Sequence, residues 1–263
     1  MQRNWPYTDH MTHSSFNKKK INYQVWLPNE TCMTQGDEYF IACLNGKQRA
    51  IRLHDYKGIY SYPWLYECVL YNLLGCKTPE ELCKLIKSTF LENNIHANII
   101  KMLEIGAGSG IFAEQLKLEL NFKEIHGLDI INEAKLAAQR DRAGLYKNYY
   151  IEDLTDLSKA KECELFSQKY NCIGVASATG WGNHIPAEGF ERALEFLVMG
   201  GIFIFHVKPN DPDPECMQLN EWIRAKLDKN TLILLKKKRC FHRKSIAGAD
   251  IFYDAYICQK ARD

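Results

Sequence analysis

The amino-acid sequence predicts an α/β fold in which helices cover both faces of a parallel sheet. From Ile99 onward, apolar runs of strand length alternate with stretches of helical pattern. The first of these runs ends in an acidic residue and a glycine-rich turn at 104–110. Two long strand-like runs, joined by a basic, glycine-containing connection, end the chain.

The first 95 residues are expected to form an N-terminal extension. Its beginning is polar, and two apolar runs at 39–44 and 48–53 then flank Asn45-Gly46, a dipeptide favoured in type I′ hairpin turns. In the aromatic-rich segment that follows, Pro63 and the apolar spacing predict a helix over 64–74. Thr78-Pro79-Glu80-Glu81 predicts the start of a second helix that ends near residue 93.

Residues 96–263 are expected to form the main domain. Its strands are predicted at 101–105, 124–128, 148–151, 171–177, 202–207, 231–239 and 251–259. Its helices are predicted at 111–120, 132–142, 157–169, 187–197 and 217–227. Gly200-Gly201 is expected to form the turn before the fifth strand.

Composition narrows the classes of protein that the chain can represent. Of its 263 residues, 46% are hydrophobic and 25% are charged, which is ordinary globular usage, and the net charge of +2 gives no field that points to nucleic acid. No apolar run is long enough to cross a membrane, and the start lacks the pattern of a signal peptide. The ten cysteines and eight histidines do not cluster at ligand spacing, so no metal site is expected. We therefore expect a cytoplasmic protein with reduced cysteines.

The glycine-rich turn carries the strongest functional signal. Gly106, Gly108 and Gly110 let the backbone approach a bound molecule closely, and Glu104 stands just before them. Asp129 ends the second apolar run, where a carboxylate can hold the two hydroxyls of a ribose. The dinucleotide fingerprint is G-x-G-x-x-G, in which a pyrophosphate meets a helix N-terminus. Here the spacing is G-x-G-x-G behind an acid, which would repel a pyrophosphate but suits an ammonium group.

This acid-led glycine turn, with Asp129 and the pattern downstream, resembles motif I of the class I S-adenosylmethionine-dependent methyltransferases over roughly residues 99–261. In that family the acid and the glycines face the methionine part of the cofactor. The resemblance implies S-adenosyl-L-methionine as cofactor and S-adenosyl-L-homocysteine as product. It also implies a seven-stranded, mostly parallel, doubly wound sheet whose last strand is antiparallel.

The resemblance implies a set of cofactor-binding residues. Ile130 is expected against the adenine face, Asp153 at the adenine amino group and the Leu154 backbone at the ring. Tyr60 belongs to an aromatic segment that is expected to close over the sulfonium. The full set is Glu104, Gly106, Ala107, Gly108, Gly110, Asp129, Ile130, Asp153, Leu154, Ser177 and Tyr60. The alternatives are a glycine turn without a ligand and, for Asp153, a solvated loop acid or a helix cap.

The loop at 177–186 follows the fourth strand, where ligands of open α/β sheets bind, and is expected to face the methyl group and the acceptor. It lacks the D/N-P-P-Y/F motif of enzymes that methylate adenine or glutamine amides, which argues against DNA methylation. His184 is the candidate general base, because its ordinary pKa suits proton transfer near neutrality. The expected acceptor-binding residues are Trp181, Asn183, Tyr66 and His206. For His184 the alternative is a helix cap.

Two further patterns bear on function. His54 and Asp55 are neighbours, and neighbouring side chains of an extended strand point to opposite faces, which argues against a base and its partner. Lys236-Lys237-Lys238-Arg239 is basic, but within a strand of a nearly neutral chain it favours a solvated sheet edge over a nucleic-acid contact.

The prediction is an enzyme that methylates an oxygen or nitrogen of a small molecule, without nucleic-acid or membrane partners. The hairpin at 39–53 could pair with a second copy. The alternatives are a non-catalytic cofactor-binding or interaction module on the same scaffold and, less favoured, an NAD-dependent oxidoreductase.

Overall fold

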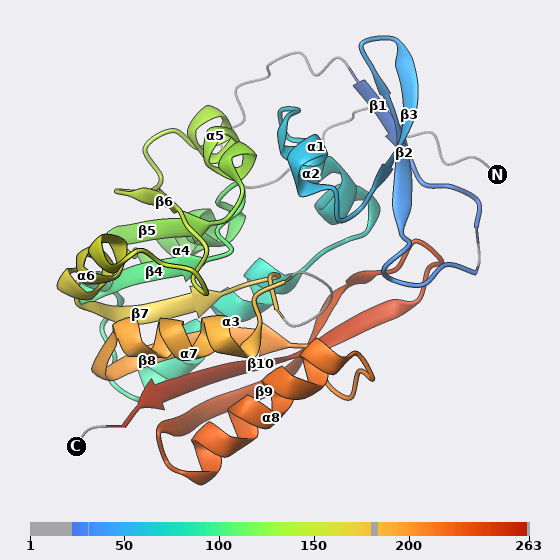
Figure 1. Ribbon diagram of the computed structural model, residues 1–263. Helices are drawn as coiled ribbons and strands as arrows, with labels where there is room; N and C mark the ends of the chain where they lie inside the picture. The colour runs from blue at the N-terminus through green and yellow to red at the C-terminus, as the bar shows by residue number, and fades with distance from the viewer. Residues whose placement is uncertain (1–22, 31, 180–183, 262–263) are drawn as a thin grey trace.

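A computed structural model describes residues 23–30, 32–179 and 184–261. Its centre is a seven-stranded sheet in the order β6-β5-β4-β7-β8-β10-β9 (Figure 1). The strands are β4 (Lys101–Ile105), β5 (Glu124–Asp129), β6 (Tyr149–Ile151), β7 (Tyr170–Val175), β8 (Leu197–Val207), β9 (Leu232–Lys244) and β10 (Asp250–Lys260). β4 to β8 are parallel, and β10 lies antiparallel between β8 and β9. The predicted fold class is confirmed.

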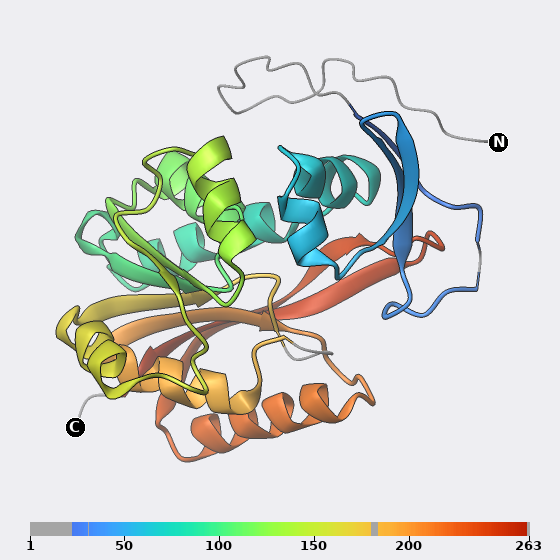
Figure 2. The ribbon, with the colours of Figure 1, turned by 45° about the horizontal axis from the view of Figure 1, so that its top comes forward.

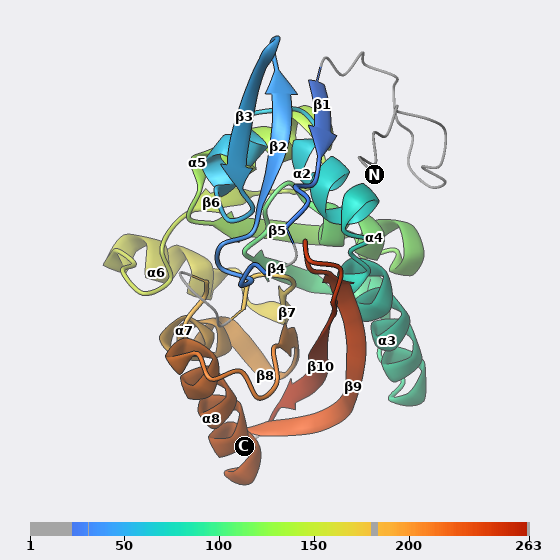
Figure 3. The same ribbon diagram turned by 90° about the vertical axis from the view of Figure 1, so that its right-hand side faces the viewer.

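Helices cover both faces of this sheet, as Figures 2 and 3 show. They are α3 (Thr78–Glu92), α4 (Ile111–Leu120), α5 (Asn132–Asp141), α6 (Lys159–Ser167), α7 (Ala187–Phe196) and α8 (Pro214–Asp228). A short 3-10 helix, η2 (Ala97–Ile99), comes directly before β4. Leu103 and Phe203 face the core that α7 and α8 share, whereas Met102 and Ile204 face the core under α3 and α4. Strands buried on both faces are typical of parallel sheets.

The fifth strand of the main domain is longer than predicted. Gly200 and Gly201 lie inside β8 and do not form a turn before it. The pairing of β7 with β8 starts at Tyr170 opposite Leu197, and its register shifts before Cys172. Gly200 has a φ of +75°, so an irregularity within the ladder accommodates the glycines that suggested a turn.

The extension contains a three-stranded antiparallel sheet, β1 (Tyr23–Trp26), β2 (Tyr39–Leu44) and β3 (Lys47–Arg52). The predicted hairpin is confirmed, with Asn45 and Gly46 at positive φ as a type I′ turn requires. β1, which pairs with β2, was not predicted. The aromatic segment forms α1 (Tyr56–Tyr60) and then α2 (Leu65–Glu67), which continues into the π-helix η1 (Cys68–Leu73).

Two buried ion pairs join the extension to the main sheet. Glu38 accepts from Arg243 on β9 at 2.5 Å, and Glu67 accepts from Arg142 at 2.7 Å. They hold α1 and α2 beside the carboxyl ends of the parallel strands (Figure 1). The division of the chain at residue 95 stays a prediction; α3, which precedes it, packs on the main sheet.

The basic run lies within β9, the outer strand of the main sheet. Lys236 pairs with Glu92 at 2.8 Å and Lys238 with Glu81 at 3.1 Å, both on α3, so these lysines meet acidic side chains of the same molecule. Within the described part of the chain, no helix is long and apolar enough to cross a membrane.

Candidate functional site

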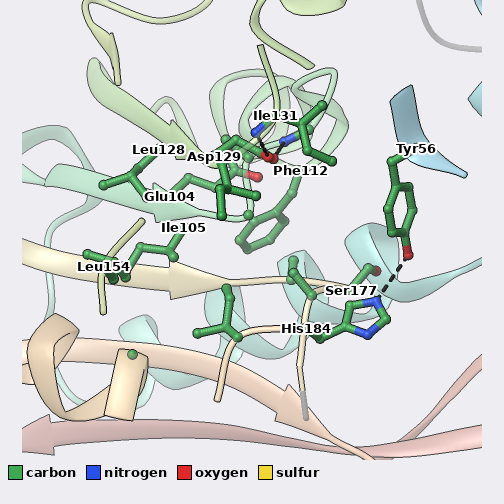
Figure 4. A pocket seen from close by; sticks show the side chains of 18 of the residues that line it. Tyr56, Glu104, Ile105, Phe112, Leu128, Asp129, Ile131, Leu154, Ser177 and His184 are labelled. Atoms are coloured by element: carbon green, nitrogen blue, oxygen red, sulfur yellow. Dashed lines mark hydrogen bonds between the residues drawn. The ribbon is translucent and has the colours of Figure 1, made fainter. Parts of the chain in front are cut away.

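A cavity of about 380 Å³ lies at the carboxyl ends of β4, β5 and β7, where the strand order of the sheet reverses. Open α/β sheets bind their ligands at such switch points. The glycine loop forms one side of the cavity and the aromatic helices of the extension form another (Figure 4).

The glycine loop depends on residues without side chains. Gly106, Gly108 and Gly110 have φ values of +66°, +53° and +93°, in the left-handed region. A Cβ on Gly106 would lie 2.4 Å from the Cβ of Ala178, and one on Gly108 would lie 2.5 Å from the hydroxyl of Tyr60. The loop is therefore clamped between β7 and the extension.

Asp129 ties this loop to the end of β5. Its Oδ2 accepts from the Gly108 N–H at 2.9 Å, and its Oδ1 accepts from the Ile131 N–H at 3.0 Å (Figure 4). Burial raises the pKa of Asp129, although these backbone N–H groups oppose that shift. The carboxylate keeps lone-pair capacity for a ligand in the cavity beyond these backbone bonds.

Glu104 is only 2% exposed, and its carboxyl lines the same cavity. Its Oε2 accepts from the Tyr146 hydroxyl at 2.7 Å. Burial raises its pKa to about 8. Among the described residues that line this cavity there is no lysine or arginine, and Arg142, outside the lining, opposes the rise of this pKa only in part.

A buried network lies behind the loop. Glu67 accepts from the Ser109 hydroxyl at 3.0 Å and from Arg142, which also donates to Glu114. Arg142 further stacks over the ring of Trp64, 4.9 Å from its centroid. The network links α2 to the start of α4, and no local sequence motif pointed to it.

Three predicted adenine-side residues line the cavity. Asp153 accepts from the Thr155 N–H at 2.8 Å and from its hydroxyl at 2.7 Å, which is an Asx turn. Leu154 is buried, whereas Ile130 is 63% exposed. The carboxylate of Asp153 is thus partly used in holding its own loop.

Tyr56, Tyr66, Ser177 and His184 form a wall opposite the glycine loop, called here the tyrosine–histidine wall. Nε2 of His184 lies 3.0 Å from the Tyr56 hydroxyl (Figure 4). The His54 ring lies edge-on to that of His184, with 5.7 Å between centroids, and Asp55 instead caps α1. Burial lowers the pKa of His54 to about 4, with the nearby His184 and Arg243 adding to the shift.

His206 lies behind this wall and does not line the cavity. Its Nε2 accepts from the Ser177 N–H at 3.2 Å, while Ser177 has a φ of +59°. Burial lowers the pKa of His206 to about 4, so it is neutral and can accept this bond. His206 therefore supports a strained residue of the wall and has no direct access to a ligand.

Most of the predicted site residues are brought together. Every predicted cofactor residue except Gly110 lines the cavity, as do His184 and Tyr66. Trp181 and Asn183 lie outside the described residues. Tyr56 and Tyr71, which also line the cavity, lie in the aromatic segment expected over the cofactor but were not singled out, and Glu215 was missed. The dense tyrosines of the segment were the only signal for the first two.

Comparisons with known proteins give a fold-level answer. No family model and no curated protein matches the chain. The N-methyltransferase NodS from Bradyrhizobium japonicum WM9, in complex with S-adenosyl-L-homocysteine, matches 80% of this chain and 98% of its own, with a TM-score of 0.53 and 14% identity. This chain has the class I methyltransferase fold. A second NodS structure matches 70% of this chain and 96% of its own, with a TM-score of 0.50 and 16% identity.

Proposed function

We propose that the protein is an S-adenosyl-L-methionine-dependent methyltransferase that acts on an oxygen or nitrogen of a small molecule and releases S-adenosyl-L-homocysteine. One observation carries the proposal. A single cavity runs from Asp153, past Asp129 and Glu104, to the pair formed by Tyr56 and His184. It thus offers sites for a nucleoside, for an amino acid and for a reacting group.

The chain's residues fit the proposed cofactor. The Glu104 carboxyl would pair with the ammonium of the methionine part, and the free lone pairs of Asp129 would accept from the ribose hydroxyls. Asp153, Leu154 and Ile130 would border the adenine. The tyrosines above the loop would place their ring faces near the sulfonium, which attracts them as a cation.

The cofactor supplies a methyl group on a sulfonium, which is a good leaving group. The protein then has to align the acceptor, and much of the rate can come from that alignment. His184 serves as the base. In the neutral tautomer with its proton on Nδ1, His184 accepts from the Tyr56 hydroxyl at Nε2, and the acceptor's proton would pass to the Tyr56 oxygen as the Tyr56 proton passes to His184.

A small acceptor is favoured over RNA or DNA. The net charge is +2, and the described lining of the cavity contains carboxylates but no lysine or arginine. A phosphate backbone needs such cations.

Two further observations bear on location and partners. The ten cysteines are all free, which supports the proposed cytoplasmic location. The outer edge of β3 in the three-stranded sheet supports the proposed homodimer.

Calorimetric titration tests the cofactor assignment. The wild-type protein should bind S-adenosyl-L-homocysteine, whereas Glu104→Ala and Asp129→Ala should each weaken that binding about tenfold or more, because each removes a charged partner. Glu119→Ala, a change at an exposed position of α4, is the matched control. Binding of NAD alone, or undiminished affinity after both changes, would overturn the proposal.

The acceptor is found by incubating the protein and S-adenosyl-L-methionine with metabolite extracts and searching for mass gains of one methyl group. A protein that binds S-adenosyl-L-homocysteine yet methylates nothing in any extract would instead be a non-catalytic module on the same scaffold.

A further inference from the structure

A second, smaller cavity of about 30 Å³ lies behind the tyrosine–histidine wall. It shares all four residues of that wall with the main cavity. The rest of the lining comes from the extension, from the residue after β7 and from the C-terminal strands: Gln35, Leu53, His54, Leu70, Thr179, His242, Arg243 and Tyr253. Its volume admits about one small polar group, of the size of a water molecule or a hydroxyl.

Two hydroxyls on this lining lack partners. Ser177 Oγ and Thr179 Oγ1 are both buried without a hydrogen-bond partner among the described residues, and Thr179 is only 4% exposed. Buried polar groups in folded proteins are nearly always satisfied, so an orphaned hydroxyl indicates a missing ligand or water. Both residues line the same small cavity.

The lining carries little net charge. Arg243 is the lining residue with a permanent positive charge among those described, and Glu38 pairs with it at 2.5 Å. Burial lowers the pKa of His54 to about 4 and that of His242 well below its usual range, with Arg243 contributing to both shifts. Near neutral pH these two histidines are therefore uncharged and cannot pair with an ion.

We infer that the methyl acceptor is a small uncharged molecule that places a hydroxyl in this second cavity, against Ser177 and Thr179. The inference rests on the proposed methyltransferase function and names its acceptor class. The rest of the acceptor would lie in the main cavity and reach the second cavity between the residues that line both, among them Tyr56 and His184. A carboxylate or an ammonium would enter without a counter-charge, because Glu38 already neutralises Arg243.

The experiment uses the full-length protein saturated with S-adenosyl-L-homocysteine. Fragments are assembled as matched triplets, so that each carbon skeleton is present as an alcohol, an amine and a carboxylate. Ligand-observed NMR then ranks their binding. The alcohols should bind best, and Thr179→Val should weaken them about fivefold by removing one hydrogen bond at constant shape.

Two measurements separate this inference from other outcomes. Thr179→Val should leave both the unfolding temperature and the affinity for S-adenosyl-L-homocysteine unchanged, because the hydroxyl has no partner to lose. Thr89→Val, which removes a buried hydroxyl that donates to Leu85 at 2.8 Å, is the matched control and should lower the unfolding temperature without changing the ranking.

The results that would overturn the hydroxyl inference differ from those that would overturn the proposed function. Amines or carboxylates that bind as well as the alcohols, alcohol binding that Thr179→Val does not change, or no fragment binding at all would overturn the inference while leaving the proposed function intact. Failure to bind S-adenosyl-L-homocysteine in the first place would overturn the proposed function itself.

Discussion

The glycine loop comes from one continuous stretch of chain between β4 and β5, whereas the tyrosine–histidine wall opposite it is drawn from distant segments. Asp129 accepts from the Gly108 N–H, and Glu104 lies opposite Gly127 in the β4–β5 ladder, so both belong to one β-α-β unit. The wall joins Tyr56 of the extension to Ser177 and His184 beyond β7, and His206 on β8 supports it. One half of the cavity is therefore set by local geometry, and the other half by how the extension docks.

The largest expected effect tests how tightly the loop half is built. Gly106→Ala would place a Cβ 2.4 Å from that of Ala178 at a φ of +66°, so the loop and the end of β7 must move apart. We expect a loss of about 3 kcal/mol in the free energy of unfolding and no measurable binding of S-adenosyl-L-homocysteine.

Gly46→Ala is the matched control, because its φ is +76° and nothing lies near its Cβ position. It should cost only about 1 kcal/mol, the conformational strain alone, and leave binding intact. Denaturant titration measures both variants. Equal losses would mean that the clamp between loop and β7 has no energetic weight.

The wall half is tested by removing one hydroxyl. Tyr56→Phe keeps the ring but breaks the contact with His184, so turnover on an identified acceptor should fall about a hundredfold while affinity for S-adenosyl-L-homocysteine holds. Tyr66→Phe alters another tyrosine of the same wall and should change turnover less than threefold. Rates measured at saturating cofactor decide between them, and equal effects would remove Tyr56 from the chemistry.

Glu104 makes the loop half sensitive to pH. With a pKa of about 8, it is largely protonated at neutrality and must lose its proton to pair with an ammonium. Affinity for S-adenosyl-L-homocysteine should therefore rise about tenfold per pH unit from about pH 6 to about pH 8 and then level off. Calorimetry across this range checks it.

Glu104→Gln should bind more weakly and without this slope. The raised pKa also means that the stability Glu104 contributes is fully present below its ordinary value of 4.5 and is lost as the pH rises through about 8. The variant should consequently gain stability relative to the wild type at alkaline pH. A parallel pH dependence in both proteins would exclude Glu104 as the titrating group.

The smallest expected effect lies at the far end of the loop half. Asp153→Ala should weaken binding of S-adenosyl-L-homocysteine at most about fivefold, because that carboxylate already holds Thr155 and would accept only one hydrogen bond from the adenine. Thr155→Val removes only the hydroxyl that Asp153 holds and leaves the carboxylate in place, so its effect on binding measures what the order of this loop contributes without the ligand contact. If Asp153→Ala lowers the affinity for S-adenosyl-L-homocysteine as much as Asp129→Ala does, the two carboxylates contribute equally to binding.

The two halves also differ in how well sequence could predict them. The glycine spacing behind Glu104 and the acid that ends β5 are local patterns, and the structure places them together in the cavity. His206 ended a strand like a site residue, yet it supports Ser177 from behind, because its side chain points into the core shared with Tyr253. Nothing in the order of residues pairs Tyr56 with His184.

The sequence by itself determined the class of sheet and the acid-led loop, because strand alternation and glycine conformation act between near neighbours in the chain. Only the tertiary structure decided what faces that loop. The buried pairs of Glu38 with Arg243 and Glu67 with Arg142 bring the extension onto the sheet. Such contacts depend on packing between segments far apart in the chain, which no local pattern encodes.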